Sequence, residues 1–515
     1  MKRRTFLQTA SVVSIPVMLN GMNVSAIARS PFVTAMNGSD KVLVLIQLDG
    51  GNDGLNTLIP LDQYDKLFAV RENIIIPESN ILQIENNLGL HPSMSGMKNM
   101  YDDGKLKIIQ DVGYPNQNRS HFRSTDIWTS GSAAEEFDTT GWMGRYFEGL
   151  YPGYPNDYPD DDCPDPFAIT LGSIVSQTCQ ATGANYSTAL IDPDNLTNII
   201  EGEPGDIDLN TCYGMQLDFL RQAIAQSNAY ADSISVAANS GTNLITYPED
   251  NRLAEQLKIV AQLISGGLQT SVYVVKLGGF DTHANQIEDN AISGNHADLL
   301  KTLSDAISVF QQDLELLGVN ERVVGMTFSE FGRRIASNAS FGTDHGTAAP
   351  LFVFGSCINP TVLGQNFEIP DEVGLQDGVP MQYDFRSVYG SILMDWFEVT
   401  ESEVQSLLYE DFQYLPIIQS CVVATNTPTT VADIETYSFP NPFENWTTIV
   451  YQSKGEKARI SIYDMRGCEL KVITEQYFVA GEHQLKIDMS GLAAGNYSYR
   501  IVTKNAQRSK VMVKI

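Results

Sequence analysis

Uniformly apolar runs recur along the chain, and most end in a polar turn that contains glycine or aspartate. They cover 41–48, 106–112, 271–277 and 322–328, with a shorter run at 351–354. Runs of this length and uniformity are typical of buried parallel strands. Helical periodicity fills the intervals, notably over 253–263 and 297–317. The pattern predicts an α/β fold, a parallel sheet flanked by helices, with ligands beyond the carboxyl ends of its strands.

Two other regions depart from this pattern. Residues 150–250 are dense in Pro, Asp, Asn and Tyr and have a weak strand signal, so we interpret them as a loop-rich insertion or cap over the sheet. A Thr-, Val- and Ala-rich stretch over 421–435 reads as a linker. Beyond it, short alternating strands separated by turns over 436–515 predict a separate β-sandwich.

The first residues have the layout of an export signal. Paired arginines at positions 3 and 4 precede a short apolar run, which ends before the small residues Ala26-Ile27-Ala28. The run is too short to span a bilayer, and no other stretch has transmembrane length. Phe6-Leu7 after the arginines favours the twin-arginine route over an ordinary secretory signal. We expect a signal peptide over 1–28, an α/β core over 38–420, and export to the periplasm by the twin-arginine machinery.

The balance of charge excludes two classes of partner. The chain has 33 Lys and Arg against 62 Asp and Glu, a net charge of -29. A surface with this excess repels nucleic acid and anionic lipid, so neither is expected as a partner.

Carboxylates and histidines cluster where the predicted strands end. Asp49 follows the first run, Asp281 and His283 follow the third, Glu330 and Arg333 follow the fourth, and Asp344 and His345 precede the last. One such cluster alone is often a plain turn. Four of them on one parallel sheet predict a metal centre at its carboxyl edge.

A further cluster, Arg119-Ser120-His121-Phe122-Arg123, follows the run at 106–112. A serine beside a histidine and between two arginines has the parts of an activated hydroxyl in an anion-binding pocket. Because adjacent residues rarely form a Ser–His catalytic pair, a metal is the favoured activator of Ser120. The alternative is a serine that only caps the start of a helix.

Six segments together resemble a known family: LDGGNDGLNT, LHPSM, NRSHFRS, GGFDTHANQ, SEFGRR and GTDHGTAAPLFVFG. The chain resembles, over about 40–420, an uncharacterised family of twin-arginine-exported proteins, domain of unknown function 1501. That family looks like a branch of the alkaline phosphatase and sulfatase superfamily. The resemblance implies an alkaline-phosphatase-like sheet with metal ligands at the strand ends and a Ser, Thr or Cys-derived nucleophile.

The same resemblance implies roles for individual residues. Asp281, His283 and His345 match one metal site, and Asp49, Glu330 and Asp344 are the candidates for a second. Ser120 matches the nucleophile, His121 is its catalytic neighbour, and Arg119, Arg123 and Arg333 would bind the oxygens of the substrate. Phe331 stands where the superfamily has a ligand histidine. The expectation is therefore one or two divalent ions, zinc before calcium or magnesium.

The C-terminal segment carries a second resemblance. Its matching pieces are 439–443, 460–464 with Gly467, Leu492 with Gly495-Asn496-Tyr497, and the closing 510–515. They resemble the type A sorting domain of the type IX secretion system. This implies passage across an outer membrane by that machinery, followed by release or attachment at the cell surface. An ordinary adhesive β-module is the alternative.

Two functions follow as expectations. The first is an exported metal-dependent hydrolase of phosphate or sulfate esters, acting on an anionic ester substrate. The second is a non-catalytic secreted or cell-surface binding or assembly protein on the same fold.

Overall fold

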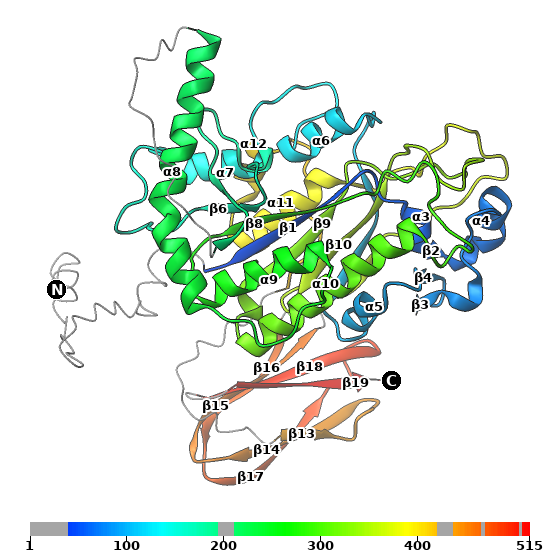
Figure 1. The fold of residues 1–515 in the computed structure, drawn as a ribbon. Coiled ribbons are helices and arrows are strands. Elements are labelled where there is room, and N and C mark those ends of the chain that lie inside the picture. Colours follow the sequence, from blue (N-terminus) through cyan, green and yellow to red (C-terminus); the bar gives the residue numbers. More distant parts are fainter. Residues whose placement is uncertain (1–39, 194–210, 420–435, 465–468, 504–506, 515) are drawn as a thin grey trace. The chain divides into compact units, whose positions relative to one another are not determined.

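The computed structural model describes residues 40–193, 211–419, 436–464, 469–503 and 507–514. The chain divides into two compact units, Met1–Cys421 and Val422–Ile515 (Figure 1). The signal predicted over 1–28 and the linker predicted over 421–435 lie outside the described residues. Among the helices that the structure describes, none combines the length and the apolar character needed to cross a bilayer.

Nine strands in the described part of the first unit form one mixed sheet, in the order β11-β5-β10-β9-β1-β8-β6-β7, with β12 paired to β5. The ladders are parallel except for those of β10, which runs antiparallel to both of its neighbours. The strands are β1 Val42–Asp49, β5 Leu106–Gly113, β6 Ala168–Leu171, β7 Ser187–Leu190, β8 Val272–Gly278, β9 Val323–Phe328, β10 Ala349–Gly355, β11 Val362–Leu363 and β12 Tyr383–Asp384.

Helices cover both faces of this sheet, and Figure 1 shows α9 and α10 lying across one of them. The described helices of the unit are α3 Gly54–Thr57, α4 Tyr64–Arg71, α5 Ser95–Asp102, α6 His121–Ser130, α7 Trp142–Leu150, α8 Cys212–Ser240, α9 Arg252–Ser265, α10 Asn295–Leu317, α11 Phe385–Phe397 and α12 Glu401–Leu407. A small antiparallel sheet, β2 Leu58–Pro60, β4 Leu88–Leu90 and β3 Leu82–Glu85, accompanies them.

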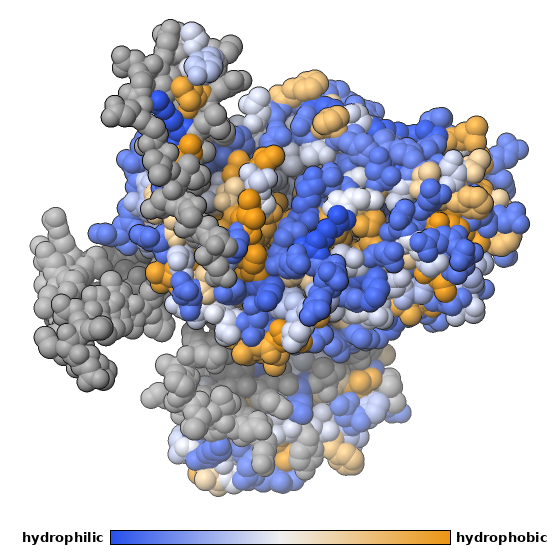
Figure 2. Space-filling view, in the orientation of Figure 1, coloured by the Kyte–Doolittle hydropathy of each residue, from blue (hydrophilic) through white to orange (hydrophobic). Residues whose placement is uncertain are grey.

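Alternation along β1 explains why the sheet is covered on both faces. Val44 and Ile46 belong to the apolar core shared with α9 and α10, whereas Leu43 and Leu45 belong to the core shared with α6, α7 and α11. Side chains of a strand point alternately to opposite faces, so a uniformly apolar strand must be buried on both. The predicted flanked α/β sheet is confirmed. On the visible face, hydrophilic residues predominate at the surface (Figure 2).

The direction of β10 differs from the parallel sheet that the apolar runs predict. β9 ends at Phe328, and β10 starts at Ala349 and returns beside it. The intervening loop therefore stays at the carboxyl edge of the parallel strands. This reversal places Asp344 and His345 at the same edge as the residues that follow β8 and β9.

The segment 150–250 contributes to the sheet itself, which corrects its interpretation as an insertion or cap. β6 pairs with β8, and β7 pairs with β6, both in parallel. Each strand has only four residues, and such short runs give a weak periodic signal among Pro, Asp and Asn.

The second unit holds two antiparallel sheets around one core that includes Ile449, Tyr451, Ile460, Tyr499 and Ile501. One sheet has the order β13-β14-β17 and the other β16-β15-β18-β19. Their bounds are β13 Thr436–Phe439, β14 Trp446–Ser453, β15 Glu456–Asp464, β16 Glu469–Phe478, β17 Gly481–Asp488, β18 Gly495–Thr503 and β19 Gln507–Lys514.

Candidate functional site

Four segments meet at the carboxyl edge of the first unit's sheet and form one cluster of titratable side chains. Asp281 and His283 lie in the loop after β8, and Glu330 follows β9. His121 is the first residue of α6, and His345 precedes β10. The structure thus brings together residues that are more than two hundred positions apart in the sequence.

Four potential ligand groups converge within this cluster. The Nε2 atoms of His283 and His345 lie 2.8 Å apart, and each is 3.2 Å from Oδ1 of Asp281. Nε2 of His121 is 3.4 Å from Oδ2 of the same carboxylate. One ligand atom each from His121, Asp281 and His345 lie within 4.8 Å of one another.

The opposite ring nitrogen of each histidine faces an oxygen that only accepts hydrogen bonds. The Nδ1 partners are Oδ1 of Asp344 for His283 at 2.9 Å, the carbonyl of Arg119 for His345 at 2.8 Å, and Oε1 of Glu330 for His121 at 2.8 Å. Each Nδ1 must therefore carry the hydrogen and donate. In the neutral rings all three Nε2 lone pairs then face the cluster, which is how protein metal ligands are commonly oriented.

This donor set fits a divalent cation. Two Nε2 lone pairs 2.8 Å apart and a carboxylate repel one another unless a positive charge lies between them. Nε2 of His121 is buried without a hydrogen-bond partner. Three imidazole nitrogens and one carboxylate oxygen suit zinc, whereas calcium and magnesium prefer oxygen ligands.

Arg333 forms an ion pair with Asp281 and fixes the position of its carboxylate. Its side chain is fully buried, and Nη2 is 2.8 Å from Oδ1 of Asp281. The same guanidinium donates to the carbonyls of Gly51 at 2.7 Å and Thr343 at 2.9 Å. It also donates to the carbonyls of Gly50 and Phe280. Because these acceptors come from three loops, Arg333 ties the loops of the site together rather than facing solvent.

The charges around the cluster set the protonation of its members. Burial on its own would raise the pKa of Asp281, but the hydrogen bond and charge of Arg333 outweigh burial and lower it. The hydrogen bond from His283 lowers the pKa of Asp344. Burial lowers the pKa of His345, whereas the hydrogen bond to Glu330 raises the pKa of His121. Both aspartates are therefore ionised at neutral pH.

The residues predicted to bind a second ion are Asp49, Glu330 and Asp344. In the structure each of them has a hydrogen-bond or ion-pair partner of its own. Oδ2 of Asp49 meets Nζ of Lys276 at 3.0 Å, and no contact among the described residues joins Asp49 to the three histidines. Glu330 accepts the hydrogen bond from Nδ1 of His121, and Asp344 accepts the one from Nδ1 of His283. Phe331 packs its ring against His121 and His345, with centroids 4.9 Å and 4.6 Å apart. The described residues therefore assemble one ligand set.

Ser120 lies at the rim of the cluster. It is the N-cap residue of α6, but its side chain makes no capping hydrogen bond. Its neighbours on both sides, Arg119 and His121, contact the cluster through the carbonyl and the imidazole. Ser120 is thus an exposed residue at the N-terminus of α6, adjacent in the chain to two residues that contact the cluster.

The three predicted substrate arginines are distributed differently. Arg333 is buried and paired with Asp281, as described above. Arg119 donates from Nη1 to the carbonyl of Gln376 at 2.9 Å. Arg123 turns away, since its guanidinium stacks on Phe137 at 3.9 Å and donates to backbone carbonyls of the loop after α6.

Two residues that sequence reasoning did not select also belong to the site. Nη1 of Arg334 lies 3.1 Å from Oδ2 of Asp344, and Nδ2 of Asn338 lies 3.2 Å from Oδ1 of Asp344. The Arg-Arg pair in SEFGRR was an available signal for Arg334. Asn338 had none, because it lies in the middle of a long loop.

Two further histidines, His91 and His296, are buried outside this cluster. His91 and His296 contact edge to face with centroids 6.1 Å apart. His296 bonds through Nε2 to the side chain of Asn52 at 3.1 Å, and Nδ1 of His91 accepts the amide of Ser93 at 3.1 Å. Burial lowers the pKa of His91 to about 3 and that of His296 to about 4. Both rings are therefore neutral in the folded protein.

These histidines predict acid sensitivity of the first unit. Unfolded histidine has a pKa near about 6.5, whereas His91 and His296 have lower pKa values in the folded protein. At a pH between these values the unfolded state binds more protons, so the free energy of unfolding decreases as the pH falls. Each histidine is expected to cost about 2 kcal/mol between pH 7 and 5. Denaturant titrations at both pH values would measure the loss. His91→Asn, which keeps an acceptor for Ser93, is expected to reduce it by about half, and an equal loss in this variant would contradict the assignment.

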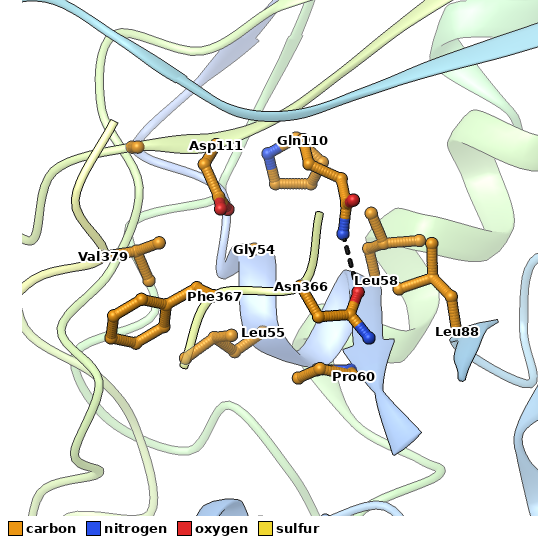
Figure 3. Close-up of a pocket in the computed structure, with 12 residues that line it drawn as sticks. Gly54, Leu55, Leu58, Pro60, Leu88, Gln110, Asp111, Asn366, Phe367 and Val379 are labelled. Atoms are coloured by element: carbon orange, nitrogen blue, oxygen red, sulfur yellow. Dashed lines mark hydrogen bonds between the residues drawn. The ribbon is translucent and has the colours of Figure 1, made fainter. Parts of the chain in front are cut away.

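A separate small pocket lies between β5 and the loop that carries Asn366 (Figure 3). Nε2 of Gln110 donates to Oδ1 of Asn366 at 2.8 Å across it. Burial raises the pKa of Asp111, which also lines the pocket, to about 6. Its cavity of about 20 Å³ has room for roughly one water. None of the cluster residues line it, so it is not the candidate site.

Comparison with known families supports both resemblances. Residues 209–379 match the model of a protein family of unknown function, DUF1501. Residues 438–514 match the model of a secretion system C-terminal sorting domain. The resemblance to the DUF1501 family is confirmed over 209–379 and that to the sorting domain over 438–514. The sorting domain indicates secretion and attachment at the cell surface. No curated protein matches the chain in sequence.

The chain also matches solved structures at low similarity, and three of these matches cover most of the chain. A protein in the alkaline phosphatase superfamily from Vibrio parahaemolyticus is 10% identical over 85% of this chain and 83% of its own, with a TM-score of 0.32. A sulfatase from Pseudoalteromonas sp. is 9% identical over 90% and 87%, with a TM-score of 0.30. A phosphonate monoester hydrolase from Silicibacter pomeroyi is 9% identical over 92% and 88%, with a TM-score of 0.33.

Proposed function

We propose that this chain, with its match to the DUF1501 family and its secretion sorting domain, is an exported metal-dependent hydrolase of phosphate or sulfate esters. One observation carries the proposal. Three imidazole Nε2 atoms lie within 3.4 Å of the ionised Asp281 carboxylate, each with its Nδ1 bound to an acceptor, and an exposed serine directly precedes His121 at a helix N-terminus.

Asp281, His283, His345 and His121 would hold one divalent ion, which we propose to be zinc. A bound zinc ion supplies a Lewis acid that favours the ionised form of a nearby hydroxyl and stabilises negative charge on oxygen. Asp344, Glu330 and the Arg119 carbonyl keep the Nδ1 protons in place, so each Nε2 stays available.

Ser120 is the proposed nucleophile. Ser120 is the N-cap residue of α6, and the N-terminus of a helix favours negative charge. The anchoring of Arg119 and His121 limits the movement of the serine between them. His121, directly beside Ser120, faces the same cluster through Nε2 and would link the serine to the proposed metal site.

Arginines supply the local positive charge that an anionic ester requires on a chain of net charge -29. Among the described contacts, Arg119 uses one of its five donors on the Gln376 carbonyl. The positive charge of Arg334 acts on Arg119, since it contributes after burial to the lowered pKa of that guanidinium. We propose that Arg119 supplies the guanidinium donors for the oxygens of the ester.

Metal removal tests this function. The full chain, purified after native export, is expected to contain about one zinc ion and to hydrolyse either an aryl phosphate or an aryl sulfate. Incubation with a chelator should remove both metal and activity, and added zinc should restore both. Plasma mass spectrometry and release of the chromogenic phenol measure the two quantities. Calcium or magnesium in place of zinc would correct the metal assignment.

The binding-protein alternative predicts a different result. A chain that holds zinc firmly but releases no phenol from any ester of the panel would favour a metal-stabilised surface or assembly protein. A folded chain without metal would remove the basis for the hydrolase.

We also propose the route of export. Residues 1–28 would direct the folded core to the periplasm by the twin-arginine machinery, and residues 436–515 would then engage the type IX machinery. Arg3→Lys with Arg4→Lys is expected to keep the chain in the cytoplasm, as cell fractionation would detect.

A further inference from the structure

A buried polar layer lies directly beneath the proposed metal ligands. Thr282 separates Asp281 from His283, and Thr343 directly precedes Asp344 and His345 in the opposing loop. Both threonines are buried, with exposures of 4% and 0%. Their hydroxyls donate to the same atom, Oε1 of Gln286, at 3.1 Å and 2.9 Å. The side-chain oxygen of Gln286 therefore accepts one hydrogen bond from each of the two loops that carry the proposed metal ligands. We call this pair of hydrogen bonds the Gln286 clamp.

The orientation of the Gln286 amide is determined by its other contact. Nε2 of Gln286 donates to Oδ2 of Asp53 at 2.7 Å. A carboxylate only accepts, so the amide nitrogen must face Asp53 and the amide oxygen must face the threonines. Both lone pairs of that oxygen are then used. Gln286 itself is only 1% exposed, so water does not compete for these bonds.

Asp53 is held in turn by a buried ion pair. Nη1 of Arg71 lies 2.8 Å from Oδ1 of Asp53, and both side chains are almost fully buried. Arg71 also donates from Nε to the carbonyl of Ile335 at 2.6 Å. Burial alone would raise the pKa of Asp53, but the charge and hydrogen bond of Arg71 lower it overall. The carboxylate that orients Gln286 is therefore charged and fixed.

We propose that Gln286 is a positioning residue that sets the separation of the His283 and His345 imidazoles. This inference rests on the proposed metal centre. The loops are also paired through their backbones, because Thr343 donates its amide to the Thr282 carbonyl at 3.1 Å. The backbone pairing fixes their register. The Gln286 clamp fixes how closely the two loops approach, and with it the 2.8 Å between the Nε2 atoms.

Isosteric removal of one hydroxyl tests the clamp. Thr343→Val keeps the shape of the side chain but removes the donor to Gln286, and Thr343→Ser keeps the donor. In the full chain, Thr343→Val is expected to weaken zinc binding by about 10-fold to 100-fold, whereas Thr343→Ser should stay within about twofold of the parent chain. Thr282→Val and Thr282→Ser form the matching pair. Competition with a chromophoric chelator measures the affinity. Equal zinc affinity in the valine and serine variants would overturn the proposal, even if the valine variant unfolds more easily.

A second measurement tests the role of Gln286 independently of metal binding. In the metal-free chain, Thr343→Val is expected to speed amide hydrogen exchange in 281–286 as well as in 342–346, because the clamp joins the two loops. Faster exchange confined to 342–346 would count against the clamp. If the parent chain binds no zinc at all, the proposed metal centre fails, and the exchange result still decides whether Gln286 couples the loops.

Discussion

Asp281→Asn is expected to weaken zinc binding by about 100-fold or more and to remove ester hydrolysis with it. The asparagine has the same shape, but it removes the negative charge that faces His121, His283 and His345. Arg333 retains the carbonyls of Gly50, Gly51, Phe280 and Thr343 as acceptors. The fold is therefore expected to persist, so the loss should appear in metal content and affinity rather than in secondary structure.

Asp49→Asn is the matched control, because Asp49 also follows a strand of the same sheet. Its carboxylate pairs with Lys276, at a partly exposed position where an ion pair contributes little. Zinc content is expected to equal that of the parent chain. If Asp49→Asn lost metal as well, Asp49 would join the ligands as the superfamily resemblance implies, and the single ligand set proposed from the geometry would be wrong.

Ser120→Ala is expected to lower the turnover of a chromogenic ester by about 1000-fold or more while zinc remains bound. The alanine removes the proposed nucleophile without touching the four metal-binding groups. Rapid mixing of the parent chain with a chromogenic ester is expected to give a burst of phenol, and Ser120→Ala should give none.

The same variant also tests whether the serine only caps its helix. Since the Ser120 side chain makes no capping hydrogen bond, thermal stability is expected to change by less than about 0.5 kcal/mol. Thr400→Ala provides the comparison, because Thr400 caps α12 in a reciprocal capping box. That variant should lose about 1 kcal/mol of stability and keep full activity. Full activity in Ser120→Ala would exclude the nucleophile role and leave a metal-bound water as the attacking group.

Much of the site could be anticipated because strand ends are a local signal. The apolar runs identify β1, β5, β8, β9 and β10 within one or two residues. In a parallel sheet the loops after the strands meet at one edge, so Asp281, His283 and Glu330 could be assigned to a common site from sequence alone. His345 is grouped with them although it precedes its strand, and only the antiparallel direction of β10 brings it to that edge.

The division of roles within that set could not be anticipated. Glu330 and Asp344 have the same acceptor chemistry as Asp281, yet they bind Nδ1 atoms of histidines rather than face the centre. The amide of Gly50 donates to Oε1 of Glu330 at 2.9 Å. Arg334 and Asn338 hold Asp344. These contacts join distant segments, and no local pattern encodes which carboxylate oxygen they will occupy.

The sequence by itself determined the alternation of buried strands and helices, the edge at which the polar clusters gather, and the C-terminal sorting domain, because each depends on residues close together in the chain. The tertiary structure decided that β10 runs antiparallel, that Asp49 pairs with Lys276, that Arg123 turns away, and that Gln286 joins two ligand loops. Such outcomes depend on which buried donors find acceptors across the whole fold, and a buried donor without an acceptor costs more than any local preference supplies.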